Sequence, residues 1–221
     1  NCAPVLDLFE GNASDIIGDR AFSSDPFATS ILGKSFIKGL ESGGVAPVVK
    51  HIPGHGRAEV DSHLALPKIE AKLTSLKKSD FIPFVNLNDS LAAMTGHLLF
   101  DQIDNEKPVT ISPNIISNII RGYIGFQGLL ISDDISMAAL TGDLSFIAEN
   151  ILTAGCDIVL HCNGNLSEMK KIVKKNQVLG VKTKKRVEEF LINLIKLKKQ
   201  TKDIDYITAL NSFDRAFSKY L

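Results

Sequence analysis

The segment from Lys50 to His63 concentrates side chains that can do chemistry within fourteen residues. It contains three histidines, a lysine and an aspartate: Lys50, His51, His55, Asp61 and His63. Gly54 and Gly56 interrupt the segment, and an apolar run precedes it. Imidazole and charged groups on a glycine-containing loop after a buried strand are typical of a catalytic loop of an α/β barrel. The alternative is a polar surface turn without chemistry.

A pair of carboxylates marks a second candidate position. Gly128-Leu129-Leu130-Ile131-Ser132 is a short apolar run typical of a buried strand, and Asp133-Asp134 follow it directly. Residues 135–140 then return to a helical pattern. Asp is a favoured N-cap, so we interpret Asp134 as the cap of that helix. Asp133 lies nearer the strand end and is the better functional candidate.

These segments resemble the family 3 glycoside hydrolases, in their bacterial β-N-acetylhexosaminidase branch. The chain has the family's Lys-His-Phe-Pro-Gly-His-Gly pattern with Ile52 in place of the aromatic residue. Four residues later come Asp-Ser-His and then Leu-Pro, a spacing specific to this branch. Other matching segments follow in family order: 3–7, 17–22, 94–97, 125–128, 132–137 and 154–157. The resemblance covers residues 2–165.

The resemblance implies a retaining exo-β-N-acetylhexosaminidase that removes terminal β-linked N-acetylglucosamine from peptidoglycan-derived fragments. Asp133 then corresponds to the nucleophile, which forms a covalent glycosyl-aspartate intermediate. His63 stands at the acid/base position of this branch, and its reference pKa of about 6.5 suits proton donation near neutrality. Asp61 orients that ring if the loop brings the two side chains together. The residues matching those that hold the sugar hydroxyls are Arg20, Lys50 and His51.

Other roles for the histidines stay open. His55 and His97 either hold the loop and a strand end through hydrogen bonds or take part directly. A zinc site formed by His51, His55, Asp61 and His63 is a competing interpretation. The spacing lacks the helical i, i+4 histidine pair of a zincin, and the resemblance explains these residues without metal. We therefore expect no metal and no cofactor.

The elements that must position these residues form a repeating pattern. Five apolar runs alternate with helical stretches, at 3–6, 45–51, 91–95, 128–132 and 157–161. This alternation predicts a parallel sheet with crossover helices, an α/β fold of the TIM (β/α)8 type. A closed barrel has eight strands and commonly about 250 residues. We therefore expect residues 1–221 to form a single partial barrel domain of about five βα units, with terminal helices from about residue 165.

The resemblance places the run at 3–6 as the fourth strand of eight, so three βα units are missing at the N-terminal side. Family members usually carry in that part an acidic residue that holds sugar hydroxyls. Two other functions stay open, each for its own reason. One is a non-catalytic or inactive half-barrel, because an open parallel sheet exposes an unpaired edge. The other is a glycoside phosphorylase, because a histidine acid/base repels an anion less than a carboxylate does.

Helix boundaries can be predicted at two places. Ser24-Asp25-Pro26 provides a cap and an N1 proline before a helical apolar stripe, and Gly43-Gly44 ends it. The stripe consists of Phe27, Ile31, Leu32, Phe36 and Leu40. Ser112-Pro113 similarly opens a stretch with Ile115, Ile116, Ile119 and Ile120.

Composition limits the partners. A formal net charge of zero gives no field that favours nucleic acid or a membrane. Twelve basic residues lie between Lys170 and Lys202, and we interpret them as the solvated face of terminal helices rather than an RNA or anion surface. Cys2, Cys156 and Cys162 are expected to be buried free thiols, which fits the cytoplasm. The resemblance implies that the partner is a small carbohydrate, bound by a monomer once the barrel is complete.

Overall fold

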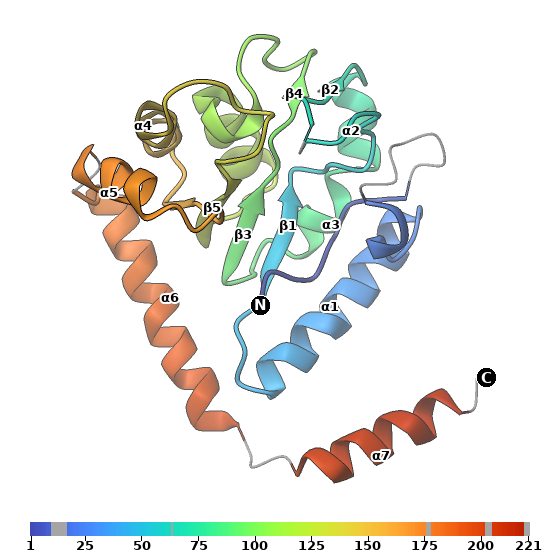
Figure 1. The fold of residues 1–221 in the computed structure, drawn as a ribbon. Coiled ribbons are helices and arrows are strands. Elements are labelled where there is room, and N and C mark those ends of the chain that lie inside the picture. The colour runs from blue at the N-terminus through green and yellow to red at the C-terminus, as the bar shows by residue number, and fades with distance from the viewer. Residues whose placement is uncertain (10–16, 63, 176–177, 202–204, 219–221) are drawn as a thin grey trace.

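The core of the protein is a four-stranded parallel sheet with the strand order β1-β3-β5-β6. The computed structural model describes residues 1–9, 17–62, 64–175, 178–201 and 205–218. The four strands are β1 (Val48–Ile52), β3 (Ala92–Thr95), β5 (Leu129–Asp134) and β6 (Ile158–Leu160). Val5 adds a parallel bridge to Lys50, so the first predicted strand lies beside β1 (Figure 1). Neighbours in the sheet follow chain order, as successive units of a partial barrel require.

The first strand is shorter than predicted. Only Val5 forms a bridge, although the Leu6 N–H also donates to Lys50 O at 2.7 Å and the Lys50 N–H donates to Pro4 O at 3.1 Å. A further two-stranded parallel pair, β2 (Lys68–Ile69) with β4 (Leu99–Phe100), was not predicted. Strands of two residues have no periodic pattern that the sequence could reveal.

Helices connect the strands and extend beyond them (Figure 1). The α-helices are α1 (Pro26–Ser42), α2 (Leu73–Lys78), α3 (Ile82–Asn86), α4 (Leu144–Ala154), α5 (Leu166–Lys175), α6 (Val181–Gln200) and α7 (Tyr206–Phe217). Two 3-10 helices, η1 (Gly18–Arg20) and η2 (Val109–Ile111), and one π-helix, η3 (Ile115–Tyr123), complete the set. None of the helices in these described ranges is both long and apolar enough for a membrane span.

The predicted boundaries of α1 are confirmed, but most of its predicted apolar stripe is exposed. The Asp25 side chain accepts from the Phe27 and Ala28 N–H groups, and Gly43 is the C-cap. Gly33 faces the core, where an added Cβ would lie 2.5 Å from a Leu6 methyl carbon. The buried face of α1 consists of Thr29, Ser30, Gly33 and Ile37, whereas most of the predicted stripe is exposed: Phe27, Ile31, Leu32 and Phe36.

The two faces of the sheet have different coverings because side chains alternate along each strand. Val49, Ala93 and Leu130 belong to the large core shared with the surrounding helices. The inner face, which would line the interior of a closed barrel, consists of Val48, Ala92, Met94 and Leu129. Val187 and Phe190 of α6 pack against this inner face.

A buried ion-pair network fixes the start of α6. Asp157 is 1% exposed and lies 2.9 Å from Arg121 Nη2 and 3.0 Å from Arg186 Nη1. The Thr183 hydroxyl donates to the same carboxylate at 3.1 Å. Removing one partner of such a buried pair leaves an uncompensated charge, so this network orients α6 against the sheet.

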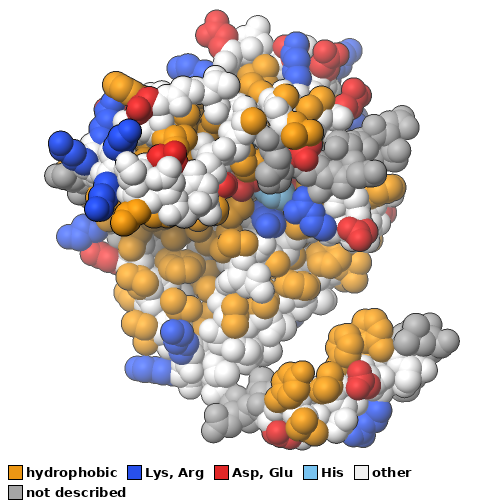
Figure 2. All heavy atoms as spheres, in the orientation of Figure 1, with side chains coloured by type: hydrophobic (Ala, Val, Ile, Leu, Met, Phe, Trp, Pro, Cys, Tyr) orange, Lys and Arg blue, Asp and Glu red, His pale blue; other side chains and the backbone are white. Residues whose placement is uncertain are grey.

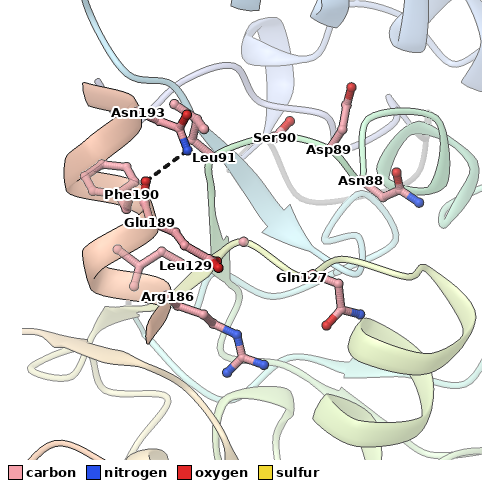
Figure 3. A pocket seen from close by; sticks show the side chains of 11 residues that line it. Asn88, Asp89, Ser90, Leu91, Gln127, Leu129, Arg186, Glu189, Phe190 and Asn193 are labelled. Carbon is pink, nitrogen blue, oxygen red and sulfur yellow. Dashed lines mark hydrogen bonds between the residues drawn. The ribbon is translucent and has the colours of Figure 1, made fainter. Parts of the chain in front are cut away.

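Exposed apolar surface nevertheless persists around α6. Figure 2 shows hydrophobic side chains gathered between α6 and α1, below the charged side chains. Leu191, Ile192 and Ile195 of α6 are each about half exposed. A pocket of about 220 Å³ also separates α6 from the amino ends of β3 and β5 (Figure 3). A helix therefore covers the inner face less completely than further barrel strands would.

The cysteines are free, but only one of them is buried as expected. Cys156 lies in the core, where burial raises the pKa of its thiol to about 12. Cys2 and Cys162 are exposed, which contradicts the prediction for them. Cys2 precedes the Val5 segment and Cys162 follows β6, the two outer segments of the sheet.

Candidate active site

The carboxyl ends of β1 and β5 bring predicted site residues together. Nε2 of His51, in β1, lies 3.9 Å from Oδ2 of Asp133, in β5. The side chain of His51 is 8% exposed and that of Asp133 is 19% exposed. The carboxylate is therefore accessible at the edge of the sheet, and the imidazole forms part of the surface behind it. This edge is where ligands bind in parallel α/β folds.

Asp133 and Asp134 make different contacts. Asp133 Oδ1 accepts from the Asp134 N–H at 2.8 Å, and Oδ2 faces His51. Asp134 accepts from the N–H groups of Ser136 and Cys162 at 3.1 and 3.0 Å and from the Ser136 hydroxyl at 2.6 Å. These donors outweigh partial burial, which by itself raises the pKa, and they lower the pKa of Asp134. Asp134 thus ties the β5 end to the segment after β6.

The helix predicted after Asp134 is wrong. Residues 135–140 form turns and bends, and the next helix, α4, begins at Leu144 with Asp143 as its N-cap. Asp134 therefore caps a turn rather than a helix. The side chains of Met137 and Ala139 are buried although the backbone there forms turns and bends. The apolar residues that suggested a helix are therefore those of a packed turn.

Asp7 supports the candidate site from beneath, a role that the sequence did not suggest. Its carboxylate is fully buried and lies 2.7 Å from His51 Nδ1. It also accepts from the backbone N–H of His51 at 3.2 Å and from that of His55 at 2.6 Å. One sequence feature could have indicated this role: Asp7 directly follows an apolar run, as Asp133 does.

The loop after β1 is held at two places, in its middle and at the end of its described part. Arg57 Nε donates to the buried Asp80 carboxylate at 2.9 and 3.0 Å, which holds the middle of the loop. At the other end, the Ala139 N–H donates to Ser62 O at 3.2 Å, so Ser62 lies beside the turn that follows Asp133. Asp61 precedes it, and its carbonyl accepts from the Leu64 and Ala65 N–H groups. His63, the predicted acid/base, lies outside the described residues.

His55 and His97 are buried and uncharged at neutral pH. Burial lowers the pKa of His55 to about 4, despite the opposing charge of Asp7, and burial also lowers the pKa of His97. His97 Nδ1 lies 2.8 Å from the Thr110 hydroxyl, and its Nε2 lies 3.1 Å from Asp134 O. These contacts favour a structural role for His97 between β3 and the β5 end. His55 packs edge-on against His51, with ring centroids 5.6 Å apart.

Lys50 and Arg20 occupy different positions. Lys50 lies within β1, next to His51, and pairs with Met94 of β3. Its side chain is partly exposed at the edge that carries Asp133. Arg20 ends the exposed helix η1, which follows the first strand and residues 10–16, themselves outside the described part. The sugar-binding roles of both residues stay predictions.

A fifth histidine position follows β6. His161 Nε2 lies 3.0 Å from the Glu168 carboxylate on α5, so this ring connects a strand end to the next helix. Among the residues whose positions are described, no three His, Cys, Asp or Glu side chains are arranged to hold a metal ion. The predicted absence of metal at the loop stays a prediction, because His63 belongs to that candidate set.

Residues 1–194 match the glycosyl hydrolase family 3 N terminal domain. The chain belongs to glycoside hydrolase family 3. The beta-hexosaminidase of Pseudomonas aeruginosa (strain LESB58) is 41% identical over 168 residues, which are 75% of this chain and 50% of that protein. The chain thus spans about half the length of the curated relatives it matches.

Solved structures of family 3 enzymes share the fold. NagZ from Neisseria gonorrhoeae, solved in complex with N-trifluoroacetyl-D-glucosamine, is 32% identical with a TM-score of 0.70, covering 91% of this chain and 64% of that one. NagZ from the same organism has also been solved in complex with zinc ion. A family 3 β-N-acetylglucosaminidase from Paenibacillus sp. is 28% identical with a TM-score of 0.75, covering 90% and 39% of the two chains. The predicted partial TIM barrel of family 3 is therefore confirmed.

Proposed function

We propose that the chain supplies the catalytic residues of a retaining exo-β-N-acetylhexosaminidase. The observation that carries this proposal is the position of Asp133 at the carboxyl end of β5, 3.9 Å from His51 and partly open to solvent. A nucleophilic carboxylate must reach the anomeric carbon while neighbouring groups hold the sugar. The partial exposure of Asp133 at the strand end supports the first role for this residue. His51 and Lys50, from the neighbouring part of the same edge, are suited to the second.

The reaction begins with attack of Asp133 on the anomeric carbon. Oδ1 accepts from the Asp134 N–H, so the carboxylate is oriented with Oδ2 on the His51 side. The bond from the anomeric carbon to the leaving oxygen breaks as the glycosyl-aspartate ester forms, and the leaving oxygen takes a proton from the general acid. Water then attacks the anomeric carbon of the ester and gives a proton to the same group, which now acts as the general base, and the C–O bond to Asp133 breaks to restore the carboxylate.

His63 is the proposed general acid and base. Burial keeps His55 and His97 uncharged near neutrality, so neither can donate a proton as an imidazolium. His161 faces Glu168 on α5, and His51 faces Asp7 through one ring nitrogen. The other four histidines are thus either uncharged or paired with a carboxylate, which supports His63 as the group that transfers the proton. Asp61 is the proposed partner that orients it.

The proposed substrate is a terminal β-linked N-acetylglucosamine of a peptidoglycan-derived fragment, handled in the cytoplasm by a single barrel domain. Relatives named beta-hexosaminidase and a NagZ solved with N-trifluoroacetyl-D-glucosamine support the N-acetylhexosamine part of this assignment. Arg20, Lys50 and His51 are the proposed contacts to the sugar hydroxyls. Charged donors suit sugar oxygens, and contacts that strengthen in the transition state raise the rate.

Trapping the intermediate tests the nucleophile directly. A fluorinated N-acetylglucosaminyl fluoride, a substrate with a good leaving group and slow ester hydrolysis, should label the enzyme covalently. Mass spectrometry of the digested protein should place the sugar on the peptide that contains Asp133, and Asp133→Asn should remove the label. A label on any other carboxylate, or on none in a protein that turns over the substrate, would refute the assignment.

A non-catalytic half-barrel is the second candidate, favoured by one observation. Val187 and Phe190 of α6 cover part of the inner sheet face that further barrel strands would cover. The chain alone can thus shield some of its apolar interior without completing a substrate site. This candidate would be supported if the chain, supplemented with the preceding βα units of a relative, folds correctly but does not turn over substrate.

Hydrolysis and phosphorolysis give different products. Product analysis with and without phosphate distinguishes the two reactions.

A further inference from the structure

Asp7 is a buried carboxylate that joins three segments of the candidate site. It follows the first strand, accepts from the His51 ring and backbone, and accepts from the His55 N–H at the start of the loop. Its side chain is completely inaccessible to solvent. A carboxylate in such a place is stable only when hydrogen bonds replace its lost hydration. Its three donors all belong to the segment that carries the candidate chemistry.

The charge of Asp7 determines where the His51 ring carries its proton. Burial by itself raises the pKa of Asp7, but the His51 ring, through its charge when it is protonated and through its hydrogen bond, and the contacts of His55 outweigh burial and lower the pKa. An ionised carboxylate is only an acceptor. The His51 Nδ1, 2.7 Å away, must therefore carry a hydrogen. In the neutral ring, Nε2 then has a free lone pair and acts as an acceptor.

The acceptor nitrogen is directed at the position of the reaction. Nε2 of His51 lies 3.9 Å from Asp133 Oδ2, too far for a direct hydrogen bond. Each of these two acceptors can receive a hydrogen bond from a separate donor group of a bound sugar. A ring in the opposite tautomer would instead present an N–H on the side of Asp133 and could not accept a hydrogen bond from a sugar hydroxyl.

We propose that Asp7 is a positioning residue that holds His51 in the Nδ1–H tautomer, so that Nε2 accepts a hydrogen bond from a sugar hydroxyl next to the Asp133 carboxylate. The part that concerns the sugar rests on the proposed function. The part that concerns the tautomer does not. Asp7 acts through the ring and touches neither the substrate nor the reacting atoms.

The tautomer can be measured without turnover. The chain completed with the preceding βα units of a family 3 relative, labelled with 15N in its histidine rings, gives two-bond and three-bond correlations that show which ring nitrogen carries hydrogen. His51→Gln assigns the His51 signals by removing them. In mildly alkaline solution, the wild type should show Nδ1–H for His51. Asp7→Asn, which can donate from its amide to Nδ1, should show Nε2–H, as expected when an amide replaces the carboxylate partner of a histidine.

Asp80→Asn is the matched control for this substitution. Asp80 is also a buried aspartate and holds the same loop through Arg57, but its side chain bonds to Arg57 and Ser79 rather than to the His51 ring, and it lies outside the proposed catalytic set. It should leave the His51 tautomer as in the wild type. An Nε2–H tautomer in the wild type, or Nδ1–H retained in folded Asp7→Asn, would overturn the proposal. If Asp7→Asn does not fold, the wild-type tautomer still decides.

Kinetics then test the sugar contact in the enzyme that turns over. Asp7→Asn should lower kcat by about 10²-fold, the loss expected from misplacing a group at the reacting centre. Both enzymes would be compared on substrates that each lack one ring hydroxyl. For the wild type, removing the hydroxyl that contacts His51 should lower activity. For Asp7→Asn, which has already lost this contact, removing the same hydroxyl should lower activity little further. Equal losses for every deoxy substrate in both enzymes would overturn the sugar contact. Complete absence of β-N-acetylhexosaminidase activity in the folded, completed barrel with the wild-type residues would refute the proposed function while leaving the tautomer result intact.

Discussion

His51 lies between two carboxylates, with Nε2 3.9 Å from Asp133 Oδ2 and Nδ1 2.7 Å from Asp7 Oδ2. One carboxylate is fully buried, and the other is partly exposed at the strand end. The buried contact with Asp7 therefore fixes the orientation of a ring that lies beside the partly exposed Asp133. Residues that support a reactive group in this way commonly decide its orientation.

Asp133→Asn should abolish turnover of a β-N-acetylglucosaminide, reducing kcat by several orders of magnitude, as loss of a nucleophile does. The amide keeps the size of the side chain but removes the attacking charge. Steady-state kinetics on the complete barrel would measure the loss. Asp134→Asn is the control, since Asp134 accepts hydrogen bonds from Ser136 and Cys162 away from the site. Near-normal turnover in Asp133→Asn with a dead Asp134→Asn would reverse the assignment.

His63→Ala should lower the rate of glycosylation by about 10²- to 10⁴-fold for substrates with poor leaving groups, because general acid catalysis is lost. Activated aryl glycosides need little protonation and should retain most of their rate in that step. Asp61→Asn should show a milder form of the same pattern. Pre-steady-state kinetics on both substrate types would separate the steps. Equal losses for both would mean that His63 organises the loop and donates no proton.

Acid should destabilise the protein through His55. Its pKa is lowered to about 4 in the folded state by burial, against about 6.5 in the unfolded chain. The unfolded state therefore binds the proton first, so this contribution is complete above about pH 6.5 and is lost as the pH falls toward about 4.

The loss from His55 amounts to about 3 kcal/mol of unfolding free energy. Urea unfolding of the folded protein at several pH values would measure it, and His55→Gln should flatten the slope in this range. An unfolding free energy that does not change between these pH limits would contradict the burial of a neutral His55.

Chelators should leave catalysis unchanged. His51 Nδ1 already pairs with Asp7, and the proposed mechanism requires only carboxylate attack and proton transfer. Dialysis against a chelator, followed by metal analysis and kinetics, would check this. Loss of activity that stoichiometric zinc restores would make the loop histidines metal ligands instead.

Residues 1–221 expressed alone should aggregate or lack activity. In the described chain, the sheet begins with the Val5 segment and ends with β6, so both outer strands have a side without a strand neighbour. Size-exclusion chromatography and thermal unfolding would report this, and adding the three preceding βα units of a family 3 relative should give a compact monomer. A soluble, cooperatively melting and active monomer of 221 residues would contradict it.

Much of the fold follows from local patterns. Four apolar runs became β1, β3, β5 and β6, because buried parallel strands need continuous apolar side chains. The cap at Asp25 and the stop at Gly43 set α1, because the backbone groups at helix ends must find partners close by in the chain. The spacing of the loop motif and the carboxylate at Asp133 likewise depended only on neighbouring residues.

Tertiary structure alone decided the contacts between distant segments. Asp7 and His51 are 44 residues apart, and no local pattern reveals that a buried carboxylate will meet that ring. The exposed stripe of α1 and the packing of Val187 and Phe190 on the inner face of the sheet have the same origin. Apolar periodicity shows that a face tends to be buried, but the surface that buries it belongs to another part of the chain. The partners of a side chain are therefore set by how the sheet and its helices assemble.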